Sequence, residues 1–200
     1  MQFADVVRSR RMTRAFSEQN VEQSVITSLV DLASRAPSAG KTQGWHLVVL
    51  QGNDVVKFWD DTLPIARRET FRFKQLLNAP VIALPFADPE AYVERYSLPD
   101  KEKTGLGLGM DAWPTPYWTV DTSFAVMTLL HAAHDLGLGA LFFAVFNGEN
   151  ELRSRLEVPG HLQLLGAIAI GWPLIEESAV GASAQRQRRK PDEIIHHSKW

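Results

Sequence analysis

The sequence of 200 residues contains no cysteine, and this absence excludes several kinds of chemistry. Disulfide bonds, a catalytic thiolate, and zinc or iron–sulfur centres ligated by cysteine are ruled out together. A cysteine-free chain suits a reducing compartment, so we expect a cytoplasmic protein. Its stability has to come from a buried core, for which a chain of this length with 45% hydrophobic residues is sufficient.

An excess of positive charge is also lacking. The 21 Lys and Arg residues face 23 Asp and Glu residues, which gives a formal net charge of -2. Dedicated binders of nucleic acid or of anionic membranes carry an overall basic excess. We therefore predict no nucleic-acid partner, and any positive patch has to be local.

Long hydrophobic runs are missing as well. The longest apolar run, Leu136–Phe146, is too short to cross a bilayer. The first residues, Met1–Phe16, contain Asp5 and several arginines and no apolar centre, so they do not resemble a secretory signal. We therefore predict no membrane partner.

What the sequence does contain is an alternation of helical and strand-like patterns. Asn20 is a good helix N-cap, Gln23 follows three residues on, and Pro37 ends the helix between them. Short apolar runs between breakers predict buried strands, and helical stretches fill the gap after the first of them. The predicted strands are 46–51, 80–87, 140–146 and 164–170, and further helices are predicted at 119–136 and 149–156.

These elements predict one layered domain with a tail. Helices interleaved with strands indicate an α/β or α+β fold over residues 1–173. Helix 119–136 is apolar on most faces, which suits the centre of the domain or a contact between subunits. The tail, 174–200, is first small and acidic, then strongly basic, and ends at Trp200. Such a tail is either disordered or wraps around another subunit.

Half of the 14 arginines lie in two short segments at opposite ends of the sequence. The planar guanidinium group suits phosphate, and each hydrogen bond to a charged oxygen contributes about 1.5–3 kcal/mol. The segments therefore predict either a site for a phosphorylated cofactor or a solvated or RNA-binding surface, although no stacking aromatics lie among them. The seven arginines are Arg8, Arg10, Arg11, Arg14, Arg186, Arg188 and Arg189.

Several known site motifs are absent. The glycine runs at 105–109 and 137–139 do not fit the dinucleotide fingerprint, and neither a P-loop nor a nucleophile elbow occurs. His131 and His134 with Asp135 lie in an apolar helix without a third placed ligand, so packing or capping is favoured over a metal site. We predict no metal.

The order of several short motifs resembles the FMN-dependent nitroreductase family. The resemblance begins with the spacing Arg10-Arg11-x-x-Arg14-x-Phe16 and a loop with Ala36-Pro37-Ser38, Gln43 and Trp45 before a strand. Taken alone, a loop of small and polar residues predicts either a ligand contact or a simple turn. The other motifs are Pro116-Tyr117-Trp118 with Asp121, Leu136-Gly137-Leu138-Gly139-Ala140 with Leu141-Phe142-Phe143, Gly171-Trp172-Pro173, and Arg189-x-Pro191.

The resemblance implies an α+β fold with a mixed sheet flanked by helices, and an intertwined homodimer with two FMN sites between the subunits. It implies that the basic N-terminal segment binds the flavin, that the Pro-Ser loop reaches the same flavin from the other subunit, and that tail arginines meet the phosphate. The implied cofactor-binding residues are Arg10, Arg11, Met12, Arg14, Pro37, Ser38, Ala39, Gly40, Gln43, Phe142, Phe143, Ala144, Arg188 and Arg189.

In two places the sequence departs from this pattern. Met12 stands where the family commonly has serine, and Lys41 where it often has asparagine. The segment 110–118, which follows a glycine-rich stretch, brings aromatic rings together. Trp113 is predicted either to stack on a planar substrate or to pack in the interior, and packing is favoured for Tyr117 and Trp118.

The implied function is hydride transfer from NADPH or NADH through FMN to a small acceptor, such as a nitro or quinone compound, with ping-pong kinetics. No residue is predicted to be catalytic, because the flavin carries the chemistry. Two alternatives stay open. One is another reaction known in this fold, such as dehalogenation, dehydrogenation or flavin destruction, and the other is a non-catalytic protein that binds flavin, phosphate or nucleic acid.

Overall fold

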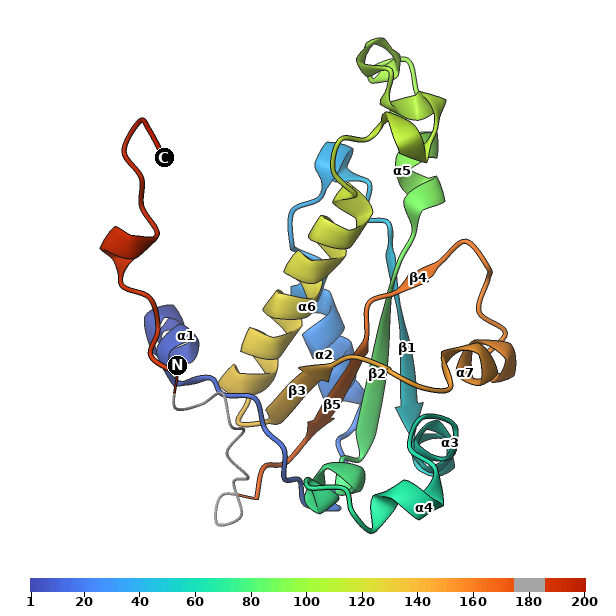
Figure 1. Cartoon of the computed structure of the whole chain (residues 1–200), viewed down its shortest axis with the longest axis vertical. Coiled ribbons are helices and arrows are strands. Elements are labelled where there is room, and N and C mark those ends of the chain that lie inside the picture. Colours follow the sequence, from blue (N-terminus) through green and yellow to red (C-terminus); the bar gives the residue numbers. More distant parts are fainter. Residues whose placement is uncertain (175–185) are drawn as a thin grey trace.

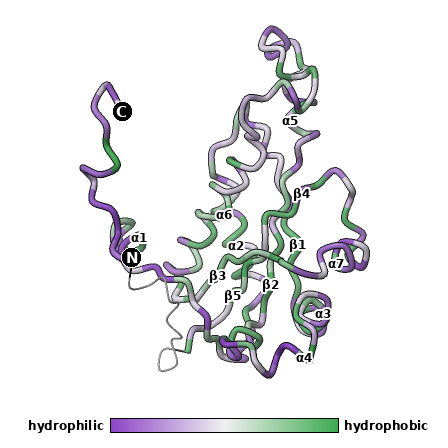
Figure 2. The backbone as a smooth tube through the Cα atoms, viewed as in Figure 1, coloured by the Kyte–Doolittle hydropathy of each residue, from purple (hydrophilic) through white to green (hydrophobic). Residues whose placement is uncertain are grey.

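The computed structural model describes residues 1–174 and 186–200. A central sheet is covered by helices on both faces, and the end of the chain stands away from the body (Figure 1). Hydrophobic segments follow the strands, whereas hydrophilic segments lie on the outside (Figure 2). The helices are α1 Phe3–Ser9, α2 Gln23–Ala33, α3 Asn53–Thr62, α4 Ile65–Arg68, α5 Pro89–Tyr96, α6 Tyr117–Asp135 and α7 Glu149–Arg155. The strands are β1 Trp45–Gln51, β2 Val81–Ala87, β3 Gly139–Phe143, β4 Gln163–Leu164 and β5 Ala167–Gly171.

The sheet has the strand order β1-β2-β5-β3, and β4 pairs with β2 beside β5. Each of these strand pairs is antiparallel. Among the described residues, parallel pairing occurs in the single bridge between Met12 and Ala140, at the outer edge of β3. The α+β class is confirmed, and the parallel contribution that the term mixed sheet implies is confined to that bridge.

Two cores lie on the two faces of the sheet, because side chains alternate along each strand. On one face Leu84 and Leu141 pack with α3 and α7 through residues such as Phe58. On the other face Ile168 packs with α2 and α6 through residues such as Leu129. β2 is buried along its whole length, as expected for the inner strand of such a layered domain.

The predicted boundaries need three corrections. Helix α2 is not capped by Asn20: its N-cap is Glu22, without a side-chain hydrogen bond. The strand predicted over 140–146 ends at Phe143, because its partner β5 begins at Ala167. The strand predicted over 164–170 is interrupted at Gly166, whose φ of 147° breaks the extended backbone.

The N-terminus forms helix α1, which the sequence analysis did not predict. Ser9 Oγ lies 2.7 Å from His134 Nε2, and the amino group of Met1 pairs with Asp135, so α1 is attached to the last turn of α6. The acidic part of the tail, 175–183, lies outside the described residues. No helix among the described residues has both the length and the apolar character needed to cross a membrane.

Candidate functional site

The N-terminal arginine segment runs along the edge of the sheet. Thr13 N donates to Ala140 O at 3.0 Å, so the segment is hydrogen-bonded to β3. This approach is possible because residue 139 is glycine: a Cβ there would lie 2.7 Å from the Thr13 side chain. The side chain of Met12 packs against the cores on both faces. The segment therefore has a fixed position, and it is held beside the start of β3.

Arg10 is a half-buried cation without a counterion among the described residues. Its Nη1 atom is buried and has no hydrogen-bond partner. The pKa of Arg10 is lowered, first by burial and then by the positive charges of Arg11 and Arg188. The two arginine segments, far apart in the sequence, therefore lie close enough to repel each other. A guanidinium group in these surroundings is stabilised by an anion.

Arg14 lies at the margin of an aromatic cavity of about 340 Å³. Its Nη1 donates to Met12 O at 3.2 Å, and its guanidinium carbon lies 5.4 Å from the centre of the Phe73 ring. The predicted residues Phe142, Phe143 and Ala144 line the same cavity. The other lining residues are Phe58, Trp59, Thr62, Leu63, Phe71, Phe73, Leu76, Leu141, Val145, Phe146 and Asn147. The space is apolar and suits a planar ring system.

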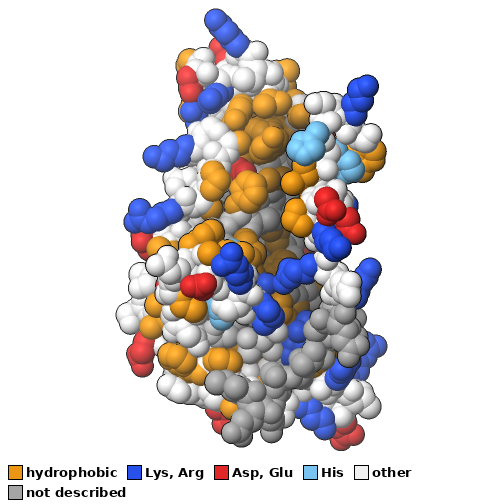
Figure 3. Space-filling model, turned by 90° about the vertical axis from the view of Figure 1, so that its left-hand side faces the viewer, with side chains coloured by type: hydrophobic (Ala, Val, Ile, Leu, Met, Phe, Trp, Pro, Cys, Tyr) orange, Lys and Arg blue, Asp and Glu red, His pale blue; other side chains and the backbone are white. Residues whose placement is uncertain are grey.

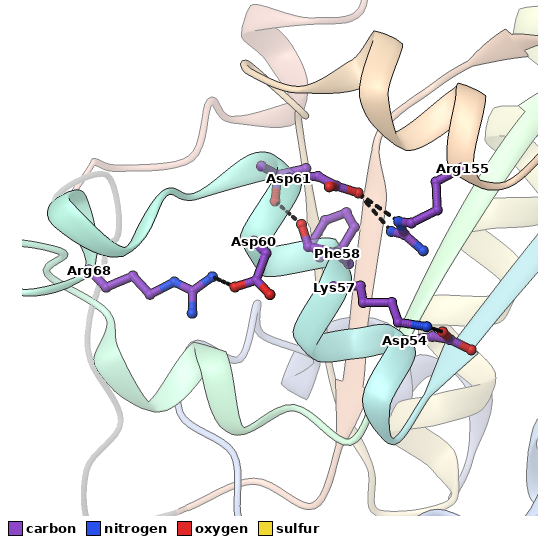
Figure 4. Close-up of polar contacts among 8 residues, drawn as sticks. Asp54, Lys57, Phe58, Asp60, Asp61, Arg68 and Arg155 are labelled. Carbon is purple, nitrogen blue, oxygen red and sulfur yellow. Dashed lines mark hydrogen bonds and ion pairs between the residues drawn. The ribbon is translucent and has the colours of Figure 1, made fainter.

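The far wall of this cavity is α3, which ion pairs hold on both sides (Figure 4). Asp61 accepts from Nε of Arg155 in α7 at 2.9 Å, and Asp60 accepts from Arg68 in α4 at 2.7 Å. Inside the wall, Trp59 stacks on Phe143 with ring centres 5.9 Å apart and an interplanar angle of 6°. This wall of the cavity is therefore held in place before a ligand binds, which favours binding of a planar ligand.

The Pro-Ser loop forms a separate site. Pro37, Ser38 and Gln43 line a polar cavity of about 510 Å³ together with Lys41 and residues 34–36. Ala39 and Gly40 are turned to the protein instead: Ala39 N donates to Asp121 Oδ2 at 2.7 Å, and Gly40 O accepts from Arg95 Nε at 2.9 Å.

The arginine segment and the loop lie at opposite ends of α6. The loop is bound to Asp121 in the second turn, and Ser9, next to Arg10, is bound to His134 in the last turn. Thirteen residues of helix separate these two positions, which corresponds to about 20 Å. The structure thus brings Arg10, Arg11 and Arg188 together and places Arg14 at the cavity where β3 ends, whereas the loop lies apart from both.

Trp113 lies in a third cluster, with only 8% of its surface exposed. Its Nε1 donates to Leu106 O at 3.0 Å, and its ring contacts Tyr96 at a centre-to-centre distance of 4.7 Å. Within one protomer this favours the packing alternative, and contact with a substrate stays a prediction. Trp118 also packs here, with its Nε1 donating to Gln163, whereas Tyr117 is exposed.

An apolar stripe on α6 faces outward. Tyr117, Phe124 and Met127 are exposed at helical spacing, with 46% of Phe124 accessible. Figure 3 shows hydrophobic side chains gathered on this side of the molecule, bordered by Lys and Arg side chains. Residues 186–200 are exposed throughout, including Ile194, Ile195 and Trp200. Exposed apolar surface of this kind marks an interaction site.

The sequence analysis missed several residues of these sites. Trp59 and Phe73 were included only in helical stretches, although they shape the aromatic cavity. Asp121 was noted in a motif, but its bond to Tyr92 in α5 was not foreseen. A carboxylate inside an apolar helix is the signal that could have identified it, because such a group has to find donors. Among the described residues, no cluster of His, Asp or Glu is suited to a metal.

Comparison with known proteins gives consistent matches. The model described as the nitroreductase family matches residues 7–172. A protein of Archaeoglobus fulgidus, provisionally named NADH dehydrogenase/NAD(P)H nitroreductase, is 27% identical over 98% of this chain and 97% of its own length.

Two solved structures share the fold. The nitroreductase CinD from Lactococcus lactis, in complex with nicotinic acid, has a TM-score of 0.75 and 20% identity, with 99% of this chain and 100% of that chain covered. An FMN-dependent nitroreductase from Clostridium difficile has a TM-score of 0.67 and 21% identity, with 98% and 99% covered.

Proposed function

The chain belongs to the nitroreductase family, and from this premise we propose that it is an FMN-dependent oxidoreductase. It passes a hydride from NADPH or NADH to a small acceptor, such as an aromatic nitro compound or a quinone. It acts as a homodimer in the cytoplasm. When bound, FMN supplies the redox chemistry, and the protein's own residues bind it, orient it and exclude water.

The observation that carries this proposal is the uncompensated charge around Arg10. A buried guanidinium nitrogen without a partner, next to Arg11 and Arg188, fits the phosphate of FMN. We assign the phosphate to Arg10 and Arg188, with Arg189 as a further predicted contact. The match is chemical: the donors are present, their charge is unpaired among the described residues, and phosphate supplies the missing acceptors.

The flavin ring is assigned to the aromatic cavity at the end of β3. Arg14 at its margin adds positive charge, which favours an anionic ring. Ala144 and Val145 come directly after β3, where the strand partner has ended, so their backbone N–H groups are not bound in the sheet ladder. We propose that one of them donates to the ring. The apolar walls exclude water from the site of hydride transfer.

The homodimer is proposed from three observations. The Pro-Ser loop lies about 20 Å along α6 from the arginine segment, so its expected contact with the flavin has to come from a second copy. The exposed stripe of Tyr117, Phe124 and Met127 on α6 supplies an apolar surface for that copy. The projecting segment 186–200 fits a tail that wraps around the partner subunit (Figure 1).

The donor and acceptor are proposed to use one face of the ring in turn, which gives ping-pong kinetics. The names of the relatives support a nicotinamide donor: one refers to NAD(P)H, and another relative was solved with nicotinic acid, which has the same type of ring as nicotinamide. The aromatic lining suits planar acceptors.

The visible absorption spectrum of the purified protein tests the proposal. We expect a flavin spectrum that bleaches when NADPH or NADH is added without oxygen, and the faster donor is the preferred one. A colourless protein that does not take up added FMN would contradict the cofactor assignment. A flavin spectrum that neither donor bleaches would contradict the role of NAD(P)H.

A binding assay separates the enzyme from a nucleic-acid binder. Tight, strongly salt-dependent binding of polynucleotide without NAD(P)H oxidation would favour the alternative reading of the arginine segments. Replacing Arg10 and Arg14 together with alanine should release the flavin. Full flavin occupancy in that variant would remove both residues from the site.

A further inference from the structure

Asp121 is a buried carboxylate in the second turn of α6. Only 6% of the residue is exposed, and no Lys, Arg or His pairs with it among the described residues. An ionised group in the interior is costly unless hydrogen bonds compensate for the lost water. The donors around Asp121 therefore show what this carboxylate holds in place.

Two hydrogen-bond donors meet the same oxygen of Asp121. Ala39 N and Tyr92 Oη each donate to Oδ2 at 2.7 Å. The pKa of Tyr92 is raised, first by burial and then by the hydrogen bond to Asp121 and its negative charge, so the phenol stays protonated as a donor. Asp121 thus joins three segments: α6, α5 and the Pro-Ser loop.

The loop held by this bond has an unusual backbone. Gly40, Lys41 and Gln43 have φ values of 60°, 55° and 55°. Residues other than glycine in the left-handed region each cost about 1–3 kcal/mol and persist only when their surroundings determine the conformation. Ala39 is the first residue of the 3-10 turn Ala39–Lys41. Its N–H bond to Asp121 therefore acts at the point where the strained stretch begins.

The supports behind the bond are rigid. Tyr92 packs edge-on against both Trp113 and Trp118, at ring-centre distances of 5.8 and 6.3 Å. Arg95, also in α5, donates to Gly40 O and is itself held by both carboxylate oxygens of Asp100, at 2.8 and 2.7 Å. The inner side of the loop is thus fixed, while Ser38, Lys41 and Gln43 line the outer cavity.

We propose that Asp121 is a positioning residue for the flavin-binding loop: through Ala39 it holds Ser38 and Gln43 in the arrangement that meets FMN bound by the partner subunit. This inference rests on the proposed function, because it takes FMN as the ligand of the loop. Asp121 does not touch the cofactor itself. Its contribution is preorganisation, which lowers the ordering cost of binding.

The test is the dissociation constant of FMN for the apoprotein of the Asp121→Asn variant, measured by flavin fluorescence. We expect binding to be weaker by roughly tenfold or more, because the neutral amide oxygen of asparagine is a weaker acceptor for Ala39 N than the carboxylate. At saturating FMN, the KM for the nicotinamide donor and kcat should return to the wild-type values, since the loop is then held by its ligand. A residue important only for folding would not give this recovery.

A second variant removes the donor of the hydrogen bond between Ala39 N and Asp121 Oδ2. Ala39→Pro removes the N–H donor and leaves Asp121 and Tyr92 in place, and proline is tolerated at the first position of a helical turn. It should weaken FMN binding as Asp121→Asn does. If Asp121→Asn does not fold, Ala39→Pro decides the question. Asp54→Asn is the matched control, because it removes an exposed carboxylate whose partner is Lys57 in the same helix (Figure 4).

The outcomes distinguish the two proposals. If the wild-type apoprotein does not bind FMN, the proposed function fails. If the wild type binds FMN and the folded fraction of each variant binds it equally well, the role of Asp121 is overturned and the proposed function stands. Weaker binding by Asp121→Asn and Ala39→Pro, with unchanged binding by Asp54→Asn, supports the inference.

Discussion

The two ends of α6 contrast in how their polar groups are satisfied. At its first turns, the buried carboxylate of Asp121 has two donors, and the adjacent loop is tied down by Arg95. At its last turn, the arginine segment carries a buried guanidinium nitrogen of Arg10 without a partner among the described residues. At the first end the buried polar groups find their partners within the protomer. At the other end the guanidinium group needs an anion as its partner.

This difference indicates that the two ends contribute to ligand binding in different ways. The arginine end attracts the ligand, because partial burial and the like charges of its neighbours destabilise the Arg10 guanidinium group. A bound phosphate would remove this destabilisation by supplying negative charge and hydrogen-bond acceptors. The loop end supplies shape, because its strained backbone is fixed before any ligand arrives. Removing charge at the arginine end should therefore weaken binding most, whereas changes at the loop end should alter affinity and stability by smaller amounts, through the conformation of the loop.

The largest effect is expected from the double variant Arg10→Ala/Arg188→Ala. Removing two charged donors from the phosphate should weaken FMN binding by about 100-fold or more. The measurement is a titration of the apoprotein with FMN. Arg67→Ala is the control, since Arg67 is exposed in α4 and lines neither the aromatic cavity nor the loop cavity. An unchanged dissociation constant in the double variant would contradict the assignment of the phosphate.

Inorganic phosphate should stabilise the apoprotein. An anion that binds only the folded state raises stability by mass action, and each kcal/mol shifts the Tm of a chain of this size by about 2–4 °C. Thermal unfolding in phosphate and in sodium chloride of equal ionic strength measures the effect. The shift should disappear in Arg10→Ala. An equal shift in that variant would place the anion elsewhere.

The strain in the loop predicts a smaller effect, on the free energy of unfolding. Lys41→Gly should stabilise the protein by up to about 1 kcal/mol, because glycine adopts the left-handed region without the steric cost. Lys57→Gly inside α3 is the matched control and should destabilise by about 1 kcal/mol. Urea unfolding of both variants gives the values. Destabilisation by Lys41→Gly would show that the loop conformation is not strained.

The smallest effect concerns His131 on α6. Its pKa is lowered from 6.5, first by burial and then by the charges of Arg10 and His134. The unfolded chain therefore binds a proton more readily than the folded chain. Stability should rise with pH through the window below 6.5 and level off above it.

The variant His131→Gln should flatten that slope, and urea unfolding of both proteins between pH 5 and 8 would show it. The control is His197→Gln in the exposed tail. If His131→Gln keeps the wild-type slope, His131 is not the group that titrates.

Local pattern was sufficient to predict much of the fold. Strands β1 and β2 and helices α6 and α7 follow from hydrophobic runs and breakers in the sequence itself. The predicted strand boundaries failed where a residue far away in the sequence sets the end of a strand. Strand β3 ends at Phe143 because its partner Ala167 is the first residue of β5, and Gly166 divides one predicted strand into two. Neither partner can be read from the local pattern.

The candidate site was predictable to a similar extent. The resemblance pointed to Arg10 and to the Pro-Ser loop, but their separation along α6 depends on the hydrogen bonds to Asp121 and His134. The proximity of Arg10 and Arg188 also requires the folded chain. These contacts join residues far apart in the sequence, so composition and spacing cannot show them.

The central claim is that one flavin site needs the arginine end of one protomer and the loop end of another. It can be tested most directly with mixed dimers of two variants that each bind no FMN as homodimers. One is Arg10→Ala/Arg188→Ala, and the other is Gly40→Val, which places a branched side chain at a φ of 60°. Both are purified together through different tags.

The FMN content of this mixed dimer is the decisive measurement. A site shared between subunits predicts about one FMN per two chains, because both defects fall in one site and the other site is intact. A site built within a single protomer leaves a defect in each, so a mixed dimer without FMN would contradict the account.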